Sequence, residues 1–388
     1  MEIGIVIHGP DIVDSGMACD IIKILQGFGR TDSRIAGAIG KTAVLDAHLE
    51  KYINISSSLK PSECIEEFFL TKDAVVLLNQ GKNVENGRIF GNIVVSNIKD
   101  RNKKPLIQIE SPSKPGGEVI PWNICSVALA TQLSQLLGTY LSDVPHVVIP
   151  IRTEDHGRRI IRKVHGVHPG EKIFINGIIV GQAISEDINI VTEDGFITEI
   201  KGAQVKEHGL EKLHGYEKRG SIDITRCWIK SGPLRGNGFL ARRHIPVLAG
   251  LSDSSTISME HIEVLPAMIK AVIIDHEAER TFELADNAQV AITIGDDTTE
   301  IAGDILFRLE IPIIGITDGD LDGFSHRKHI HPGSVIFRVS DGHDDIIGRK
   351  IRLEIFRGYK TGSFNSIIEL KEKVRLLANR HIKFSRNY

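Results

Sequence analysis

The chain has 388 residues, of which 41% are hydrophobic and 25% are charged. This composition predicts a globular protein of two or three domains and excludes fibrous, disordered and low-complexity classes. Forty-seven Lys and Arg residues against fifty Asp and Glu residues leave a net charge of −3, so neither nucleic acid nor an anionic membrane surface is an expected partner.

Residues 1–145 alternate short apolar runs with amphipathic segments. The apolar runs predict buried parallel strands at residues 3–7, 35–39, 74–78 and 106–109. Five helices are expected. One begins after Ser15, one follows Thr42 and ends at residue 49, one begins at Pro61, one contains residues 87–91, and one spans residues 125–137. Strand–helix units repeated in this way predict a doubly wound, Rossmann-like parallel sheet with helices on both faces.

Residues 146–265 have a different pattern, in which short β-type bursts are separated by turn residues. The turns between residues 172 and 205 are Asn176-Gly177, Gly181, Asp194-Gly195 and Gly202. Hairpin turns of this kind predict an antiparallel barrel or sandwich of up to about six strands.

Residues 266–388 return to the strand–helix pattern. Strands are expected at residues 271–274, 290–294, 312–316, 335–339 and 351–355. A helix is expected over residues 298–309, where Asp297 and Glu300 have the spacing of a capping box. Residues 370–377 are expected to form the first part of a terminal helix. The sequence therefore predicts an α/β protein with two parallel-sheet units separated by a small antiparallel segment.

Two loops of the first unit combine a glycine with a lysine at a predicted strand end, where α/β proteins bind ligands. Lys41, Thr42 and Lys82 lie at or before predicted helix starts, which favour anions. Together with His8, at the end of the first strand, they predict a site for a small phosphorylated or anionic ligand. The alternative is that these Gly-Lys pairs form turns with solvated lysines.

Two nucleotide-binding motifs are absent from this unit. A P-loop needs a glycine five positions before Gly40, and that position is Ile35, so we reject a P-loop NTPase. The segment HGPDIVDSG after the first strand has no GxGxxG pattern, so an NAD site is not expected.

Acidic residues follow three consecutive strands of the last unit. The candidate metal ligands are Glu277, Asp296, Asp297, Asp318, Asp320 and Asp322. Carboxylates side by side at one sheet edge repel one another unless a cation neutralises them, and oxygen ligands suit Mg²⁺ or Mn²⁺. The alternative assigns Asp297 to helix capping and Asp318-Gly319-Asp320 to a turn.

Two further groups of residues carry weaker signals. His326, His329 and His331 form an HxxHxH pattern that can bind a metal, but Arg327 and Lys328 between them favour an exposed basic loop. A basic run can grip a phosphorylated substrate or a nucleic acid, although such runs are usually solvated surface. Its residues are Arg226, Lys230, Arg235, Arg242 and Arg243.

Cysteines and terminal sequence indicate the setting. Cys19, Cys64, Cys125 and Cys227 form no CxxC pair, which predicts no disulfide framework, zinc finger or iron–sulfur site. The start MEIGIVIHGP does not resemble a signal peptide, and no stretch reaches the roughly 18 apolar residues of a membrane helix. We expect a cytoplasmic protein with no membrane partner.

Several segments resemble a family of uncharacterised proteins from methanogenic archaea, over nearly the whole chain. They are HGPDIVDSG, LLNQGKN, INGIIVGQA, KEHGLEKL and IGDDTTEIAGDILFRLEIPIIGITDGDLDG. The resemblance implies an archaeal source and a cytoplasmic setting, and no reaction. The last unit also resembles the Toprim fold, in which a glutamate and a DxD pair bind Mg²⁺; Glu277 and Asp318/Asp320 would correspond, with Ala278 where that fold usually has glycine.

The leading hypothesis is an enzyme that uses Mg²⁺ or Mn²⁺ for phosphoryl transfer or hydrolysis on a phosphorylated or nucleotide substrate. The rival is a non-catalytic protein that binds a metabolite or a partner, because the sequence has no GxSxG or HExxH motif. A nucleic-acid-binding protein is the third hypothesis, and the charge balance places it last.

Overall fold

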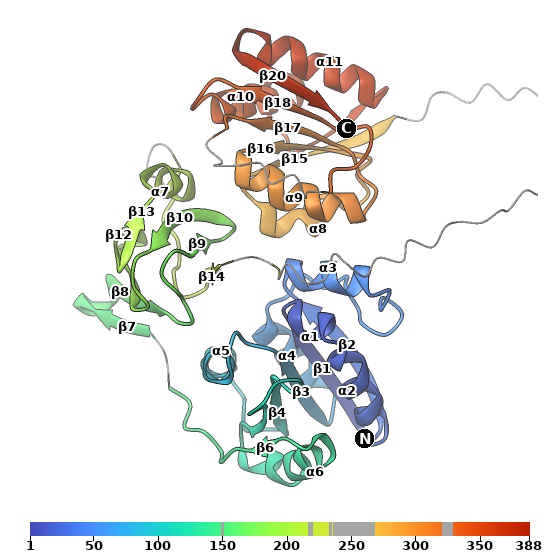
Figure 1. Ribbon diagram of the computed structural model, residues 1–388, viewed down its shortest axis with the longest axis vertical. Helices are drawn as coiled ribbons and strands as arrows, with labels where there is room; N and C mark the ends of the chain where they lie inside the picture. The colour runs from blue at the N-terminus through green and yellow to red at the C-terminus, as the bar shows by residue number, and fades with distance from the viewer. Residues whose placement is uncertain (149–150, 216–219, 233–234, 236–267, 320–328) are drawn as a thin grey trace, which may run out of the picture. The chain divides into compact units, whose positions relative to one another are not determined.

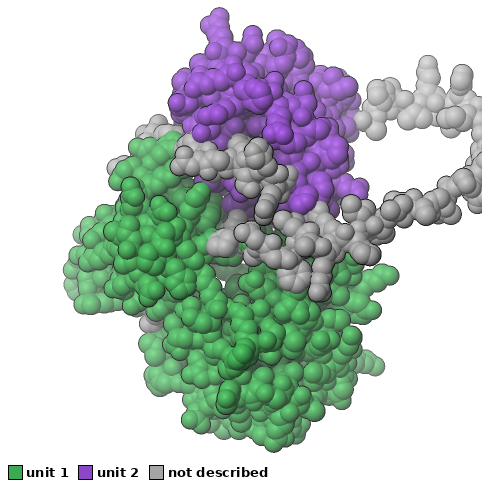
Figure 2. Space-filling view, viewed as in Figure 1, with its two compact units in different colours: residues 1–236 green, residues 237–388 purple. Residues whose placement is uncertain are grey.

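The computed structural model describes residues 1–148, 151–215, 220–232, 235, 268–319 and 329–388. The chain divides into two compact units, residues 1–236 and residues 237–388, shown in green and purple in Figure 2. The predicted boundary at residue 145 falls inside unit 1, and the one at residue 265 lies outside the described residues. The three-domain division therefore stays a prediction.

A six-stranded sheet organises the first part of unit 1 (Figure 1). Its strands are β1 (Glu2–His8), β2 (Arg30–Ala36), β3 (Ala74–Asn79), β4 (Leu106–Glu110), β5 (Glu118–Pro121) and β6 (Tyr140–Leu141). They lie in the order β2-β1-β3-β4-β5-β6, with β1 to β4 parallel and β5 antiparallel to β4. Because β2 pairs on one side of β1 and β3 on the other, the strand order reverses between β1 and β3.

Helices cover both faces of this sheet. They are α1 (Asp11–Asp14), α2 (Met17–Gln26), α3 (Ala38–Asp46), α4 (Pro61–Thr71), α5 (Val84–Ser96), the short η1 (Ile124–Ser126) and α6 (Val127–Leu137). Alternate residues of a strand point to opposite faces. Ile5 and Ile7 thus share a core with α1, α2, α3 and α6, and Val6 shares one with α4 and α5.

Two antiparallel sheets form the rest of unit 1. Their elements are β7 (Ile151–Glu154), η2 (Asp155–Gly157), β8 (Arg159–Val164), β9 (Lys172–Ile175), β10 (Ile178–Ala183), β11 (Ile188–Glu193), β12 (Phe196–Lys201), β13 (Ala203–Val205), α7 (Glu207–His214) and β14 (Ile229–Ser231). The sheet orders are β13-β10-β9-β14 and β12-β11-β8-β7. Both predicted hairpins are present, and φ is positive at both turn residues of Asn176-Gly177 and Asp194-Gly195, as tight hairpins require.

A second six-stranded sheet forms unit 2. Its elements are β15 (Ile269–Asp275), η4 (Ala278–Arg280), α8 (Thr281–Leu284), β16 (Val290–Ile294), α9 (Asp296–Arg308), β17 (Ile313–Thr317), β18 (Val335–Val339), α10 (Asp344–Lys350), η5 (Ile351–Ile355), β19 (Thr361–Phe364), α11 (Ile367–Ala378), η6 (Asn379–His381) and β20 (Ile382–Asn387). The order is β19-β15-β16-β17-β18-β20, with four parallel central strands and antiparallel outer ones. One core lies under α8 and α9, and the other under α10, η5 and α11.

These sheets confirm the predicted α/β class, with parallel strands in two sheets and antiparallel strands in the other two. Between residues 172 and 205, all of which the structure describes, there are five strands, β9 to β13, within the predicted limit of about six. No helix within the described residues has both the length and the apolar character to cross a membrane.

Three local predictions were wrong. The second strand ends at Ala36, because Gly37 has φ 88° and the chain turns there into α3. The alternation of Ile351, Leu353 and Ile355 suggested a strand, but Leu353 is 60% exposed and the segment is helical. Gly295, with φ 94°, is the N-cap residue of α9, so Asp297 lies inside the first turn and not at the N-cap position.

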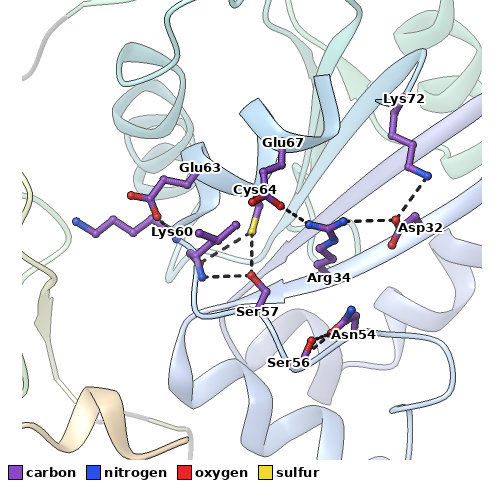
Figure 3. A network of polar contacts seen from close by, with 11 residues as sticks. Asp32, Arg34, Asn54, Ser56, Ser57, Lys60, Glu63, Cys64, Glu67 and Lys72 are labelled. Carbon is purple, nitrogen blue, oxygen red and sulfur yellow. Dashed lines mark hydrogen bonds and ion pairs between the residues drawn. The ribbon is translucent and has the colours of Figure 1, made fainter. Parts of the chain in front are cut away.

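A polar network fixes α4 to the sheet of unit 1 (Figure 3). Nη1 of Arg34 donates to Oε2 of Glu67 at 2.7 Å, and Nη2 of Arg34 lies 3.7 Å from Oδ2 of Asp32. Cys64 is fully buried, with Sγ 3.9 Å from Oγ of Ser57, and burial raises the pKa of its thiol. A buried protonated thiol is a poor nucleophile, so we assign this network to stability.

Candidate functional site

A histidine between two carboxylates follows the first strand of unit 2. Nδ1 of His276, the residue after β15, lies 2.6 Å from Oδ1 of Asp275. Nε2 of His276 lies 3.5 Å from Oδ1 of Asp345, in the first turn of α10. Each of the three residues can offer one ligand atom to a metal ion, and these atoms lie within 4.8 Å of one another. We call Asp275, His276 and Asp345 the His276 group.

The local backbone holds the imidazole in this place. His276 has φ 55°, a left-handed conformation that costs a residue other than glycine about 1–3 kcal/mol. A Cβ atom at Gly295 would lie 2.7 Å from Nε2 of His276, so glycine at this position gives the ring its room. The imidazole therefore lies against the start of α9.

The hydrogen bond of His276 to Asp275 determines which ring nitrogen of the neutral imidazole faces Asp345. A neutral imidazole carries one N–H, and the 2.6 Å contact assigns it to Nδ1, which donates to Asp275. The lone pair of Nε2 then faces the Asp345 carboxylate, which is also an acceptor. Either a second proton or a metal ion between Nε2 and Asp345 removes this repulsion. Metal-bound histidines commonly donate their other N–H to a carboxylate, as His276 does.

Buried carboxylates occupy the neighbouring strand ends. Oδ2 of Asp296 accepts the backbone N–H of Gly319 at 3.1 Å, and Oδ2 of Asp318 accepts that of Gly342 at 2.9 Å. Asp296 is 7% exposed, Asp318 is 5% exposed and Asp344 is fully buried. Each bond joins a strand end to the loop after the next strand. The predicted acids Asp296 and Asp318 therefore lie at one edge of the sheet, as parallel strands require.

Cationic side chains flank this edge, and two of them pair with Glu277. Oε2 of Glu277 accepts from Arg280 at 2.7 Å, and Oε1 pairs with Nζ of Lys360. Glu277 therefore pairs with two protein cations, and its role as a metal ligand stays a prediction. Burial raises the pKa of the neighbouring Glu279 to about 7. The exposed Arg338 donates from Nη2 to the carbonyl of Gly319 at 3.4 Å.

The other predicted metal ligands are less informative. Asp297 is half-buried in the first turn of α9, and Asp320 and Asp322 lie outside the described residues. In the histidine pattern, His326 lies outside the described residues as well. The ring of His329 packs on Phe307, with centroids 5.0 Å apart, beside the C-terminal half of α9.

Lys82, predicted to bind an anion in unit 1, has protein acceptors instead. Its Nζ atom lies 2.8 and 2.7 Å from the two carboxylate oxygens of Glu171. It also donates to the carbonyl of Gly166 at 2.6 Å and to Oγ of Ser231 at 3.1 Å. Lys82 therefore ties the end of β3 to the antiparallel sheets, and an anion would have to displace Glu171.

The Lys41–Thr42 pair lies in α3 itself. Oγ1 of Thr42 donates to the carbonyl of Ile39 at 2.6 Å, and Lys41 is only 4% exposed. Arg235, from the predicted basic run, lies 2.6 Å from Oδ2 of Asp46 and reaches Oγ1 of Thr42 at 3.4 Å. Arg235 therefore contacts two residues of this helix. The role of Lys41 and Thr42 in binding an anion stays a prediction. Arg242 and Arg243 lie outside the described residues.

None of the three residues of the His276 group was among the predicted metal ligands, although the sequence places His276 and Asp345 after strands. His276 directly follows a predicted strand, and Asp345 lies in SDGHDD, which directly follows another. Both segments therefore follow strand carboxyl ends, and applying the strand-end rule to histidines and to the acids after every strand would have found them.

Comparisons with known proteins place the chain among archaeal sequences. A family profile described as "Uncharacterized protein conserved in archaea (DUF2117)" matches residues 5–359. A relative named "Uncharacterized protein MJ0065", from Methanocaldococcus jannaschii, is 38% identical over 353 residues, which is 90% of each chain. No solved structure matches the chain.

Proposed function

The chain belongs to this archaeal family, as its sequence motifs indicated, and we propose that unit 2 is a divalent-metal-dependent enzyme acting on a phosphorylated or nucleotide substrate. The observation that carries the proposal is the His276 group. Its histidine donates one N–H to a carboxylate and directs its other nitrogen at a second one. Buried Asp296 and Asp318 add negative charge at the same sheet edge, which a cation would offset.

The donor set favours Mn²⁺ over Mg²⁺. Mg²⁺ prefers oxygen ligands and keeps several waters, whereas imidazole suits transition metals. The acids alone predicted either ion, and His276 moves the preference toward Mn²⁺. Nε2 of His276 and a carboxylate oxygen of Asp345 would be the ligands, with Asp275 orienting the ring.

The cationic side chain of Arg338, at the same sheet edge, supports a phosphate-bearing substrate. A metal ion polarises a phosphoryl oxygen or lowers the pKa of a bound water. Phosphoryl transfer otherwise depends on positioning and on charge neutralisation, and a guanidinium such as that of Arg338 can pair with a further phosphate oxygen. The exposed position of Arg338 beside Gly319 places this charge within reach of solvent.

Calorimetric titration of the chelator-treated full chain with Mn²⁺ tests the metal centre. We expect one site, and at least about a tenfold loss of affinity in His276→Gln and in Asp345→Asn. Glu372→Gln is the matched control, because Glu372 is an acid of unit 2 that pairs with Arg375 on α11. Absence of binding, or equal affinity in Asp345→Asn and wild type, contradicts the proposal.

Turnover separates the enzyme from a metabolite-binding protein. The Mn²⁺-loaded chain is incubated with nucleoside di- and triphosphates and sugar phosphates, and the products are followed by ³¹P NMR. Conversion that disappears in Asp345→Asn supports the enzyme. A nucleotide that binds and is recovered intact supports the rival.

A further inference from the structure

Polar side chains meet at the strand-order reversal of unit 1, far along the chain from the His276 group. β1 and β3 pair in parallel, with His8 opposite Asn79, the last residue of each strand. In doubly wound sheets the crevice at such a reversal is the usual ligand site. The side chains at this point are joined by a series of hydrogen bonds.

The first residue of the series is Glu110, which is fully buried at the end of β4. Its Oε1 atom accepts the backbone N–H of Gly81 at 2.7 Å. Its Oε2 atom accepts from Nε2 of Gln108 at 2.8 Å. The orientation of Gln108 is fixed independently, because its Nε2 also donates to the carbonyl of Gly87 and its Oε1 accepts from Trp122. Glu110 therefore acts as an acceptor on both oxygens, as an ionised carboxylate does, although burial raises its pKa.

The carboxylate sets the orientation of the next two groups. Oε2 of Glu110 also accepts from Nδ2 of Asn79 at 2.7 Å, so Oδ1 of Asn79 faces His8. Nδ1 of His8 lies 2.9 Å from that oxygen and must donate to it. In the neutral imidazole the proton is then on Nδ1, and Nε2 carries the lone pair.

Nε2 of His8 remains available to a ligand. Among the described residues it has no hydrogen-bond partner, and it is not fully buried. The ring stacks on Phe90, with centroids 4.0 Å apart and planes 17° from parallel, so its orientation is fixed. Burial, with a smaller contribution from the charge of Lys230, lowers the pKa of His8 to about 4. The imidazole is therefore a neutral acceptor at physiological pH.

Lys230 brings a positive charge to the same place. It lies in the middle of β14, whose next residue, Ser231, contacts Lys82 at the end of β3. The charges that act on Lys230 come from Asp11, Lys82 and Glu171, and burial lowers its pKa. β14 thus carries a cation from the antiparallel sheets toward the ends of β1 and β3.

We propose that this edge of unit 1 binds a small phosphate group that carries its own P–OH. The Lys230 ammonium pairs with the charge of the phosphate, and Nε2 of His8 accepts the hydrogen bond of its hydroxyl. Inorganic hydrogen phosphate and the monoanion of a phosphate monoester both offer this combination. Sulfate has the same tetrahedral shape and at least as much negative charge, but it has no hydroxyl, so it would direct an acceptor at the lone pair of His8.

Calorimetric titration of the full chain with phosphate, methyl phosphate and sulfate at pH 6 tests this site. A chelator keeps unit 2 free of metal, so that failure of the metal centre does not affect the result. Phosphate or methyl phosphate should bind at least about tenfold more tightly than sulfate, and their relative affinity identifies the free ion or the ester as the better ligand. His8→Phe retains the ring on Phe90 and should abolish the preference over sulfate, whereas Lys230→Met should weaken all three ligands.

Two controls make the test decisive. Lys23→Met removes an exposed lysine of α2 that pairs with Asp20, and it should change nothing. The ¹⁵N spectrum of His8 should show a protonated Nδ1 in wild type, and Asn79→Leu should lose this tautomer preference. Equal binding of phosphate and sulfate, no binding to the folded chain, or a protonated Nε2 in neutral His8 would each overturn the proposal.

Discussion

The carboxyl ends of the two six-stranded sheets differ in how their polar groups are satisfied. In unit 1 a chain of hydrogen bonds joins an imidazole, an amide and a carboxylate: His8 donates to Asn79, and Asn79 donates to Glu110. In unit 2 carboxylates gather on neighbouring strands, and His276 lies between two of them. The same topological position therefore carries a neutral acceptor in one sheet and a negative cluster in the other.

This difference shows what topology determines and what it leaves to the side chains. Parallel strands bring their carboxyl ends to one edge, and this fixes where a ligand binds. The charge and protonation of the residues at that edge then select the ligand class. A negative cluster with an imidazole favours a metal ion, whereas a neutral imidazole beside a lysine favours an anion with a donor.

The largest expected effect is the loss of the Glu110 carboxylate. Glu110→Ala leaves buried donors of Asn79, Gln108 and Gly81 without their acceptor, and should lower the free energy of unfolding of unit 1 by about 4 kcal/mol. Trp122 and Trp228 are the two tryptophans of the chain, and both lie in unit 1. Urea unfolding followed by tryptophan fluorescence therefore reports on this unit.

The matched control for Glu110 is Asp345→Asn, which removes an acid of unit 2 and should leave the tryptophan transition unchanged. A loss below about 1 kcal/mol in Glu110→Ala would mean that the donors find other acceptors. The proposed orientation of Asn79 and His8 by the Glu110 carboxylate would then be wrong.

The next effect is a pH dependence of unit 1 that originates at His8. Its pKa is lowered from 6.5 to about 4 in the folded chain, so protonation favours the unfolded state. The contribution to stability is complete above pH 6.5 and is lost as the pH falls through 4, by about 3 kcal/mol in all. His8→Phe should remove this dependence. The measurement compares urea unfolding of the two proteins at pH 7, 5 and 4, and parallel curves would contradict the lowered pKa.

In unit 2 the corresponding test is stabilisation by metal. Mn²⁺ at one hundred times its dissociation constant should stabilise the folded state by about 2.7 kcal/mol. Hydrogen exchange in β15, β16 and α10 measures this effect within unit 2. Asp345→Asn should abolish the added protection, and the exchange of β1 and β3 serves as the internal control. Equal protection in the variant would exclude the His276 group as the site.

The sequence predicted the strands better than the side-chain contacts. Continuous apolar runs predicted β3 and β16, because strands covered on both faces are apolar throughout. The segment at residues 351–355 failed because its alternation fits a strand, while its helical register depends on which side chains the core accepts. The local pattern therefore predicted the continuously apolar segments correctly and failed at the alternating one.

The candidate sites divide in the same way. Position at a strand end predicted Asp296, Asp318 and His8 as edge residues. The partner of Lys82 was not predictable, since Glu171 lies 89 residues further along the chain in a different sheet. The His276 group needed a residue with positive φ to meet the first turn of α10, the helix after β18. Such contacts depend on tertiary geometry, which a single sequence does not contain.

The smallest expected effect concerns the contact between Lys82 and Glu171, which joins the two parts of unit 1. Burial raises the pKa of the Glu171 carboxyl, but hydrogen bonds from Lys82 and its neighbours outweigh this, so the net pKa is lowered. The side chains are 36% and 18% exposed, and solvent screens the pair, so Lys82→Met should cost only about 1 kcal/mol. The loss should shrink at high salt, because a half-exposed ion pair is screened.

The control for this variant is Lys103→Met, which breaks the exposed pair of Lys103 with Asp100 and should change stability by less than about 0.5 kcal/mol. Lys82→Met also separates two interpretations of the strand end. If Lys82 only joins the sheets, the variant should keep the preference of unit 1 for phosphate over sulfate, because His8 sets that preference. If the variant loses all phosphate binding while its stability is unchanged, Lys82 leaves Glu171 when the anion binds, and the original prediction of Lys82 as an anion ligand is the better one.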